Sequence, residues 1–311
     1  MPKVPVKIIL DDAMQGKYAA SAFAVNNMEQ IESIVEAARI CHSPVIIMIS
    51  IKSLRYSHYL PYLIDAAIKE NPDIPIAMHL DHGVSFKQCK EAIDFGFSSV
   101  MVDGSFDEEG RPASFEYNLE LTKKVADYAR GFGVTVEGEI GFIGGKEDDI
   151  DIMGHKFTDP SIVKKFVEYT KIDSLAVSIG NSHGLNKFDG EQKLRLDILS
   201  EIHANIPQIP LVLHGASSLP DQYIKKIAEY GGNLRNTKGV PMEQIKQAVK
   251  SGIRKVNIYS DITLCMIAEI RKILLERPEV TDPREYLGAC RKEITRLAIN
   301  KFTEFGSINK I

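Results

Sequence analysis

The sequence lacks tryptophan altogether and contains only four cysteines among its 311 residues. The cysteines are Cys41, Cys89, Cys265 and Cys290, and no two of them form a C-x-x-C pair. Neither a disulfide framework nor a thiolate zinc site is therefore indicated. We expect four buried, reduced thiols.

Long hydrophobic runs are also missing. The longest apolar stretch, residues 44–51, is far shorter than the roughly 20 residues that a membrane-spanning helix needs. Residues 1–20 contain a short apolar run but no cleavable signal pattern. These absences predict a cytoplasmic protein without a membrane partner.

An excess of basic charge is a third feature that the chain does not have. Its formal net charge is −4 and its basic residues are scattered, so we expect no nucleic-acid partner. Hydrophobic residues make up 44% and charged residues 26% of the chain, which is the balance of a folded globular protein. A small molecule is the expected ligand.

Eight short apolar runs recur along the chain, each as long as a strand. They occupy residues 20–25, 44–50, 75–81, 98–104, 133–141, 174–180, 210–216 and 255–261. Segments with apolar residues at helical spacing lie between them, among them 28–40, 86–96, 117–133 and 160–170. Apolar strands alternating with helices predict a parallel sheet covered by helices, and eight such units close a (β/α)₈ TIM barrel.

An open, doubly wound sheet is the alternative architecture. We prefer the barrel because no G-x-G-x-x-G turn follows the first strand, and the glycine-rich residues 138–149 have a different spacing. The prediction is an α/β fold with a single TIM-barrel domain over residues 1–311. Residues 230–247 are predicted to form an inserted surface loop before the eighth strand, and the tail from Asp282 a last helix that stops at Gly306.

Histidines follow three of the predicted strands. His82, His183 and His214 stand at the ends of the third, sixth and seventh strands. The carboxyl ends of barrel strands converge on one face, so these side chains can meet there. Neutral imidazoles that converge in this way suit a zinc ion with an open position for substrate.

A set of motifs accompanies the histidines. In chain order these are HLDHG (79–83), EGEIG (137–141), GGKEDD (144–149), SHGLNK (182–187), LHGAS (213–217) and VNIYSD (256–261). With this order and these strands, the chain resembles class II fructose-bisphosphate aldolases and their tagatose-bisphosphate relatives. Segments near both ends, AFAVNNMEQ and DPREYLG, match as well. The similarity covers nearly the whole chain, and the ordered set is far more specific than any single motif.

The resemblance implies roles for individual residues. Asp81 would exchange a proton with the aldehyde-derived hydroxyl, and Glu147 would be the acid–base of a mobile loop. The implied ligands of Zn²⁺ are His82, His183 and His214, with Asp103 and Glu139 at an alternate metal position.

Phosphate in such barrels usually lies at the loops after strands seven and eight, which here contain Gly215, Ser217 and Ser260. The resemblance adds Lys187 as a phosphate-binding lysine and Gly184 as a backbone contact. It also implies a monovalent cation, Na⁺ or K⁺, near the phosphate. Further substrate contacts that it implies are Asn26, Ser50 and Asn257.

The reaction that the resemblance implies is reversible aldol cleavage of a ketose 1,6-bisphosphate, fructose 1,6-bisphosphate first, to dihydroxyacetone phosphate and glyceraldehyde 3-phosphate. Breaking the C3–C4 bond leaves electron density on the C2 oxygen, and zinc stabilises this enediolate as a Lewis acid. Asp81 would take the C4 hydroxyl proton in cleavage, and Glu147 would protonate the carbanion carbon. We expect the enzyme to be a homodimer or homotetramer.

Two positions depart from the family pattern. Tyr259 stands where fructose-bisphosphate aldolases often have an aspartate and tagatose-type relatives a small residue, and Thr263 stands where relatives with the long insertion often have an arginine. The choice between fructose and tagatose bisphosphate therefore stays open.

Three further mechanisms or classes compete with the zinc aldolase. A Schiff-base aldolase needs a lysine inside the barrel, but residues 174–180 have none, and Lys255 is predicted at the start of the eighth strand, pointing to the opposite end. A zinc-dependent hydrolase would use the same metal to activate water, and a non-catalytic barrel would only bind a sugar phosphate. The presence of Asp81 and Glu147 favours the aldolase.

Overall fold

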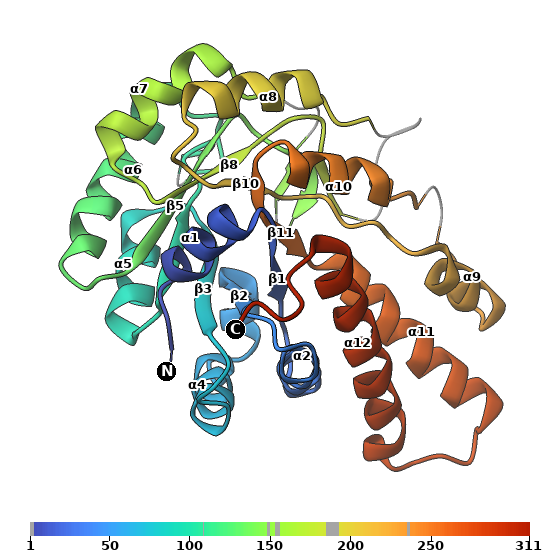
Figure 1. Cartoon of the computed structure of the whole chain (residues 1–311). Coiled ribbons are helices and arrows are strands. Elements are labelled where there is room, and N and C mark those ends of the chain that lie inside the picture. The colour runs from blue at the N-terminus through green and yellow to red at the C-terminus, as the bar shows by residue number, and fades with distance from the viewer. Residues whose placement is uncertain (1–2, 108, 148–149, 153–155, 185–192, 235–236) are drawn as a thin grey trace.

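The computed structural model of the chain describes residues 3–107, 109–147, 150–152, 156–184, 193–234 and 237–311. Eight parallel strands close into a barrel in the order β1-β2-β3-β4-β5-β8-β10-β11, and β11 pairs with β1 (Figure 1). The predicted TIM barrel is confirmed.

Each predicted apolar run overlaps one strand of the barrel. The strands are β1 (Ala20–Ala24), β2 (Val45–Ser50), β3 (Ile76–Gly83), β4 (Ser99–Val102), β5 (Thr135–Ile140), β8 (Ser174–Val177), β10 (Leu211–Leu213) and β11 (Ile253–Ile258). The last run differs at both ends, because β11 begins at Ile253 and ends at Ile258, and the final residues of the run, Ser260 and Asp261, already belong to a helix.

Helices surround the barrel and close its amino-terminal end. They are α1 (Val6–Gly16), α2 (Met28–Cys41), α3 (Ile51–Tyr56), α4 (Leu60–Glu70), α5 (Phe86–Phe95), α6 (Phe115–Arg130), α7 (Pro160–Thr170), α8 (Leu196–Asn205), α9 (Asp221–Glu229), α10 (Met242–Lys250), α11 (Ser260–Glu276) and α12 (Pro283–Phe305). Several begin at a side chain that accepts a backbone N–H, such as Asn27 before α2 and Ser85 before α5.

The two faces of the strands carry different side chains. On the outward face, aliphatic residues such as Ile47, Val100 and Leu175 pack against the helices in the main hydrophobic core. On the inward face, small and flexible apolar residues of β1, β2 and β3 pack against Ile9 and Leu10 of α1. Helix α1 therefore seals the barrel at one end and leaves the carboxyl ends of the strands for a site.

A second, three-stranded sheet lies beyond the barrel strands and was not predicted. Its strands are β6 (Gly144–Glu147), β7 (Ile150–Ile152) and β9 (Ser182–His183), in the order β7-β6-β9. Gly145 of β6 pairs in parallel with His183 of β9. The segment that was predicted as a mobile loop is thus attached, through β6, to one of the three histidines.

The prediction for residues 230–247 was wrong in its second half. Helix α10 begins at Met242 inside that range, because Pro241 fixes the entry to the helix and the apolar residues Ile245, Ala248 and Val249 are buried at helical spacing. The predicted last helix is confirmed as α12, capped by Asp282 and ended by Gly306 in the left-handed conformation.

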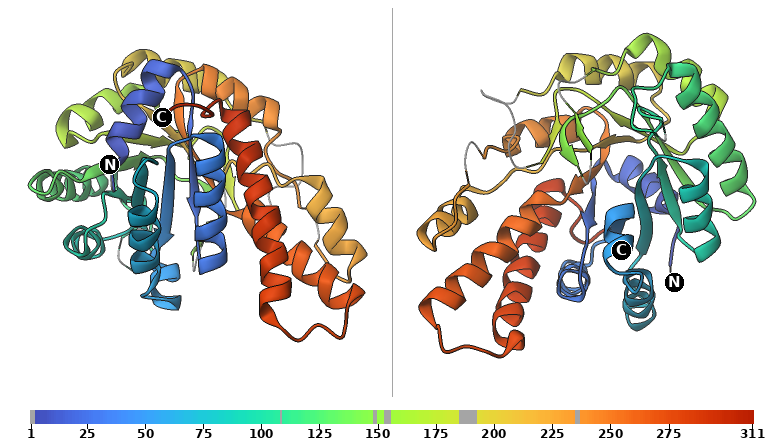
Figure 2. Two further views of the ribbon diagram at one scale, coloured as in Figure 1. Left: turned by 60° about the horizontal axis from the view of Figure 1, so that its bottom comes forward. Right: turned by 180° about the vertical axis from the view of Figure 1, so that it is seen from behind.

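Helices α11 and α12 run side by side and project away from the barrel (Figure 2). Helix α12 also packs along α2, where Arg291 pairs with Glu32. None of the helices within the described residues is both long and apolar enough to cross a membrane. The four cysteines are free and buried, as predicted.

Candidate active site and metal centre

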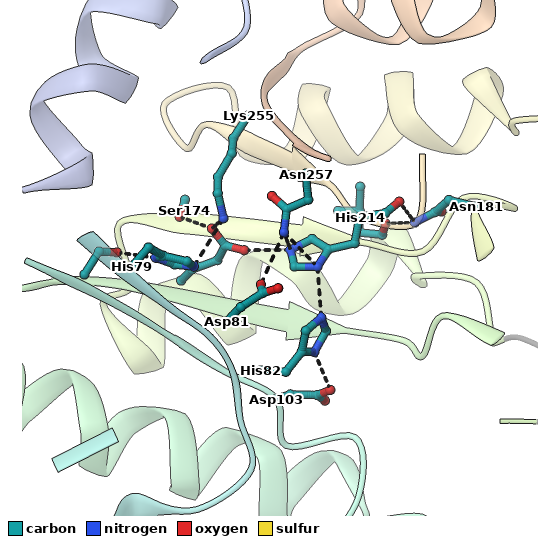
Figure 3. Close-up of polar contacts among 12 residues, drawn as sticks. His79, Asp81, His82, Asp103, Ser174, Asn181, His214, Lys255 and Asn257 are labelled. Carbon is teal, nitrogen blue, oxygen red and sulfur yellow. Dashed lines mark hydrogen bonds and ion pairs between the residues drawn. The ribbon is translucent and has the colours of Figure 1, made fainter. Parts of the chain in front are cut away.

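Strand β3 delivers two neighbouring residues, Asp81 and His82, to the same place. Consecutive side chains of a regular strand point to opposite faces, so both could not enter the barrel mouth from regular backbone. The pairing register shifts between Leu80 and Gly83, and His82 adopts a left-handed φ of 49°. This conformation is costly for a non-glycine residue, of order 1 kcal/mol. The irregular backbone therefore turns His82 toward the residues that Asp81 already faces (Figure 3).

Two of the three histidines meet directly. The Nε2 atom of His82 lies 3.1 Å from Nδ1 of His214, which follows β10. On their far sides, His82 Nδ1 lies 3.0 Å from Asp103 Oδ2, and His214 Nε2 lies 2.9 Å from Glu137 Oε1. Each carboxylate can only accept a hydrogen bond, so each ring carries its proton on the far side and turns a lone pair toward the other ring.

His183 completes the group from the short strand β9. Its ring centroid lies 5.3 Å from that of His82 and 6.2 Å from that of His214. One nitrogen from each of the three rings can be chosen so that all lie within 4.8 Å of one another. The sequence prediction that three distant histidines converge is confirmed.

This geometry fits a divalent metal. Two nitrogens on a tetrahedral zinc ion, each about 2.05 Å away, are about 3.3 Å apart, close to the 3.1 Å between His82 and His214. Two neutral nitrogen atoms at this distance, both with lone pairs facing inward, have no proton to share. An all-imidazole donor set suits zinc, and three protein ligands leave a fourth position for substrate.

Asp81 lies beside the histidines. Its side chain is buried, and its Oδ1 accepts a hydrogen bond of 3.3 Å from Asn257 Nδ2. The same Asn257 nitrogen lies 3.2 Å from His214 Nδ1. Asn257 therefore bridges the predicted acid–base residue and a predicted metal ligand, and its own Oδ1 is buried without a hydrogen-bond partner among the described residues.

A polar layer lies beneath these residues, and the sequence patterns did not predict it. Lys255 Nζ lies 2.8 Å from Glu137 Oε2 and 3.3 Å from His79 Nε2, and Lys255 and Glu137 are fully buried. The prediction that Lys255 points to the opposite end was wrong, because β11 starts at Ile253 and holds Lys255 inside the barrel. Period-two spacing could have revealed this layer, since Lys255 and Glu137 precede Asn257 and Glu139 by two residues.

Burial and charge set the protonation of this layer. Burial alone would raise the pKa of Glu137, but the Lys255 ammonium and the hydrogen bond with His214 hold that pKa far below its ordinary value. Burial, aided by Lys255, lowers the pKa of His79 well below its usual range. Burial also lowers the pKa of His214. Glu137 is therefore a carboxylate, and His79 and His214 are neutral imidazoles.

The remaining predicted residues fall into three groups. Those at the carboxyl ends of strands β1, β2, β5, β10 and β11 lie on the same end of the barrel as the histidines: Asn26, Ser50, Glu139, Gly215, Ser217 and Ser260. Gly184 directly follows β9, and Glu147 is the last residue of β6. Lys187 lies outside the described residues.

Two of these positions show why their residue types are needed. Gly215 has a φ of 54°, and a Cβ there would lie 2.6 Å from the Ser182 backbone, so only glycine lets the loop after β10 pass β9. Asn26 Oδ1 accepts a hydrogen bond of 2.6 Å from Ser53 Oγ, and Asn26 Nδ2 lies 3.4 Å from the Tyr259 hydroxyl. Tyr259, the departure from the family pattern, is thus a half-exposed residue above the first strand.

A closed (β/α)₈ barrel with three converging imidazoles and an adjacent buried carboxylate is the arrangement of a metal-dependent barrel enzyme. The chain belongs to the class-II fructose-bisphosphate aldolase family, whose model matches residues 4–310.

Individual relatives agree with this assignment. The chain is 44% identical over 310 residues to the fructose-bisphosphate aldolase of Giardia intestinalis, covering 99% of this chain and 94% of that one. It is 41% identical to the fructose-bisphosphate aldolase of Xanthobacter flavus, covering 100% and 93%. Among solved structures, the YdjI aldolase from Escherichia coli K12 superposes with a TM-score of 0.75 at 27% identity, covering 98% of each chain.

Proposed function

We propose that the protein catalyses the reversible aldol cleavage of fructose 1,6-bisphosphate to dihydroxyacetone phosphate and glyceraldehyde 3-phosphate. The observation that carries the proposal is the meeting of His82, His183 and His214 beside Asp81 at the open end of the barrel. A metal ligand and an acid–base group within reach of one small substrate is the arrangement that aldol chemistry requires.

His82, His183 and His214 would hold Zn²⁺. When bound, the ion supplies Lewis-acid stabilisation of the negative charge that develops on the C2 oxygen as the C3–C4 bond breaks. Asp103 and Glu139 are proposed as ligands of an alternate metal position. Asp103 also contacts His82 Nδ1 at 3.0 Å, which would orient that imidazole when the metal is in its main position.

Asp81 is proposed to take the C4 hydroxyl proton in cleavage and to return it in condensation. It is buried and contacted by Asn257, so it is oriented before substrate arrives. Glu147 is proposed to exchange the proton at the carbanion carbon. Its strand β6 pairs with β9 at His183, so the backbone of Glu147 is attached to the strand that carries a proposed metal ligand.

The proposed phosphate contacts come from the loop after β10 and the start of α11. Gly215, Ser217 and Ser260 stand there, and Ser260 is the first residue of a 17-residue helix whose amino-terminal N–H groups favour an anion. The remaining proposed substrate contacts are Asn26, Ser50, Gly184, Lys187 and Asn257. A monovalent cation beside the phosphate, Na⁺ or K⁺, belongs to the same proposal.

The other parts of the proposal concern the protein in the cell. We propose a single catalytic domain over residues 1–311, a cytoplasmic location, and a homodimer or homotetramer with no nucleic-acid or membrane partner. The projecting pair α11 and α12, with Leu274 and Leu275 exposed, is the segment of this chain where a subunit contact is expected.

The test is a paired rate measurement on fructose 1,6-bisphosphate and tagatose 1,6-bisphosphate, which differ at C4. We expect cleavage of the fructose epimer to be faster, to be abolished by a chelator and to be restored by zinc. A faster rate on the tagatose epimer would transfer the assignment to a tagatose-bisphosphate aldolase. Zinc binding without cleavage of either epimer would favour a hydrolase or a non-catalytic barrel.

Borohydride separates the metal mechanism from a Schiff-base mechanism. Because Lys255 lies inside the barrel, it is the lysine that such a mechanism would use. Its Nζ is fully buried and lies 2.8 Å from the Glu137 carboxylate, so it is engaged in an ion pair and is not presented as a nucleophile. We expect no covalent adduct on treatment with substrate and borohydride, and an adduct on Lys255 would refute the metal mechanism.

A further inference from the structure

A continuous row of polar contacts leads from the metal centre into the barrel interior (Figure 3). His214 Nε2 lies 2.9 Å from Glu137 Oε1, and Glu137 Oε2 lies 2.8 Å from Lys255 Nζ. The side chains of Glu137 and Lys255 have no exposed surface. One carboxylate therefore contacts a candidate metal ligand with one oxygen and an ammonium group with the other.

The chemistry of these groups leaves one arrangement of protons. An ammonium group only donates hydrogen bonds, and a carboxylate only accepts them. His214 must therefore carry its proton on Nε2 in order to donate to Glu137. Its other nitrogen, Nδ1, then presents a lone pair, and this is the atom that lies 3.1 Å from His82 Nε2.

Lys255 is itself fixed by a second neighbour. Its Nζ lies 3.3 Å from Nε2 of the buried His79, and His79 Nδ1 lies 2.8 Å from Ser99 Oγ. Ser174 adds a longer contact of 3.4 Å to Glu137 Oε2. Because Lys255 and Ser174 both contact this oxygen, the Glu137 carboxylate cannot turn away from His214.

Stability alone does not account for this arrangement. Removing two charges from water costs several kcal/mol per ion, and apolar residues of similar size often serve stability equally well. Elsewhere in the barrel interior the chain does use apolar residues, such as Met101 and Val212. An oriented contact with His214 is what a charged pair can provide and an apolar pair cannot.

We propose that Glu137 and Lys255 are positioning residues for the metal, with Lys255 fixing Glu137 and Glu137 holding His214 as the Nε2–H tautomer with Nδ1 turned to the ion. The inference rests on the metal centre of the proposed function, and it adds two residues from β5 and β11 to the three imidazoles. Carboxylates behind metal-binding imidazoles typically change metal affinity 10- to 100-fold.

The sharpest test is Glu137→Gln, which has nearly the same size and shape. Lys255 only donates, so it would take the amide oxygen and leave the amide NH₂ facing His214. His214 would then have to accept at Nε2 and carry its proton on Nδ1, the nitrogen needed by the metal. We expect ¹⁵N NMR of the zinc-free variant to show this reversed tautomer, and competition with a chelating indicator to show a 10- to 100-fold weaker zinc affinity.

A second variant removes both charges together. Glu137→Leu/Lys255→Met leaves no unpaired buried charge, so the barrel is expected to fold, while His214 loses the acceptor for its Nε2 proton. We expect mixed tautomers and again a 10- to 100-fold loss of zinc affinity. The matched control is Glu269→Gln, which alters the Lys226–Glu269 pair between α9 and α11 and should leave zinc affinity and the tautomer unchanged.

The proposal is overturned if either Glu137 variant folds and keeps the wild-type tautomer and a zinc affinity within about threefold of wild type. It is equally overturned if the double variant fails to fold while Glu137→Gln retains both properties. These measurements need no turnover. An absence of bisphosphate cleavage by the zinc-loaded wild-type protein would instead count against the proposed function.

Discussion

The outward and inward faces of the barrel strands are both buried, yet they are made of different residues. The outward face is mostly aliphatic, as Ile47, Leu175 and Val256 illustrate, with the buried Arg254 as an exception. The inward face changes from apolar residues against α1 to the charged layer of Glu137 and Lys255, and then to the three converging histidines. Core residues and site residues of the barrel strands are therefore equally buried in this molecule. What distinguishes them is whether the side chain points outward to the helices or inward to the barrel centre.

The difference has a physical cause. An outward side chain meets a helix surface of aliphatic residues, where any unpaired polar group would lose its hydrogen bonds to water. An inward side chain meets residues from several strands at once, so polar groups can satisfy one another, as His79, Glu137 and Lys255 do. The barrel centre can therefore hold an oppositely charged pair, whereas the outward Arg254 donates to backbone carbonyls of Val249 and Ile253.

The largest effect on turnover is expected at Asp81, near the carboxyl end of β3. Replacing Asp81 with Ala should lower turnover by at least ~10²-fold, because a positioned acid–base group contributes about that much. Zinc content should stay at the wild-type level, since Asp81 is not among the three converging nitrogen ligands. Steady-state rates and metal analysis of Asp81→Ala, with Asp81→Asn as the size-matched control, make the test. Near-normal turnover in both variants would remove the role assigned to Asp81.

An outward residue should behave in the opposite way. Ile47 is fully buried on the outward face of β2, and Ile47→Ala should lower the free energy of unfolding by about 2–5 kcal/mol through lost burial and a cavity. Turnover per folded molecule and zinc affinity should be unchanged. Denaturant unfolding of the zinc-free protein measures the change in the free energy of unfolding. A large loss of zinc affinity would show that the two faces are coupled and would break the comparison.

The apolar part of the inward face should give an intermediate effect. Ala77 of β3 lies in the cluster that α1 closes, and Ala77→Val would insert two methyl groups into a filled space. Overpacking of this kind costs about 1–3 kcal/mol. Thermal unfolding should show the loss, with Ala77→Gly as a variant that reduces volume at the same position. An increase in stability on Ala77→Val would mean that the barrel is not filled at this end.

The smallest effect is expected outside the barrel. His203 of α8 packs over Gly252, and burial together with Arg254 lowers the pKa of His203 below its ordinary value of 6.5. The unfolded state then binds the proton more tightly than the folded state, so stability that is present above about pH 6.5 is lost as the pH falls below it.

We therefore expect the drop in Tm between pH 7.5 and pH 5.5 to be slightly smaller in His203→Gln than in wild type. The exposed His58 provides the control variant His58→Gln. A steeper acid dependence in His203→Gln than in wild type would contradict the sign of this shift.

The sequence by itself determined the barrel, its eight apolar runs and the three histidines at strand ends. These features depend on the local alternation of apolar runs and helical periods, which a chain carries wherever it folds. The direct neighbour of a predicted ligand, Asp81, could be placed for the same reason, since it stands beside His82 in one strand.

Only the tertiary structure decided how the three histidines are oriented. Glu137 and His214 are 77 residues apart, and Lys255 and Glu137 are 118 apart, so no local pattern links them. The left-handed turn at His82, the small sheet that holds His183 and the choice of His214 Nδ1 all arise from contacts between distant strands. A sequence specifies which side chains face inward, but closure of the barrel specifies which of them meet, and therefore which nitrogens of His82 and His214 face each other.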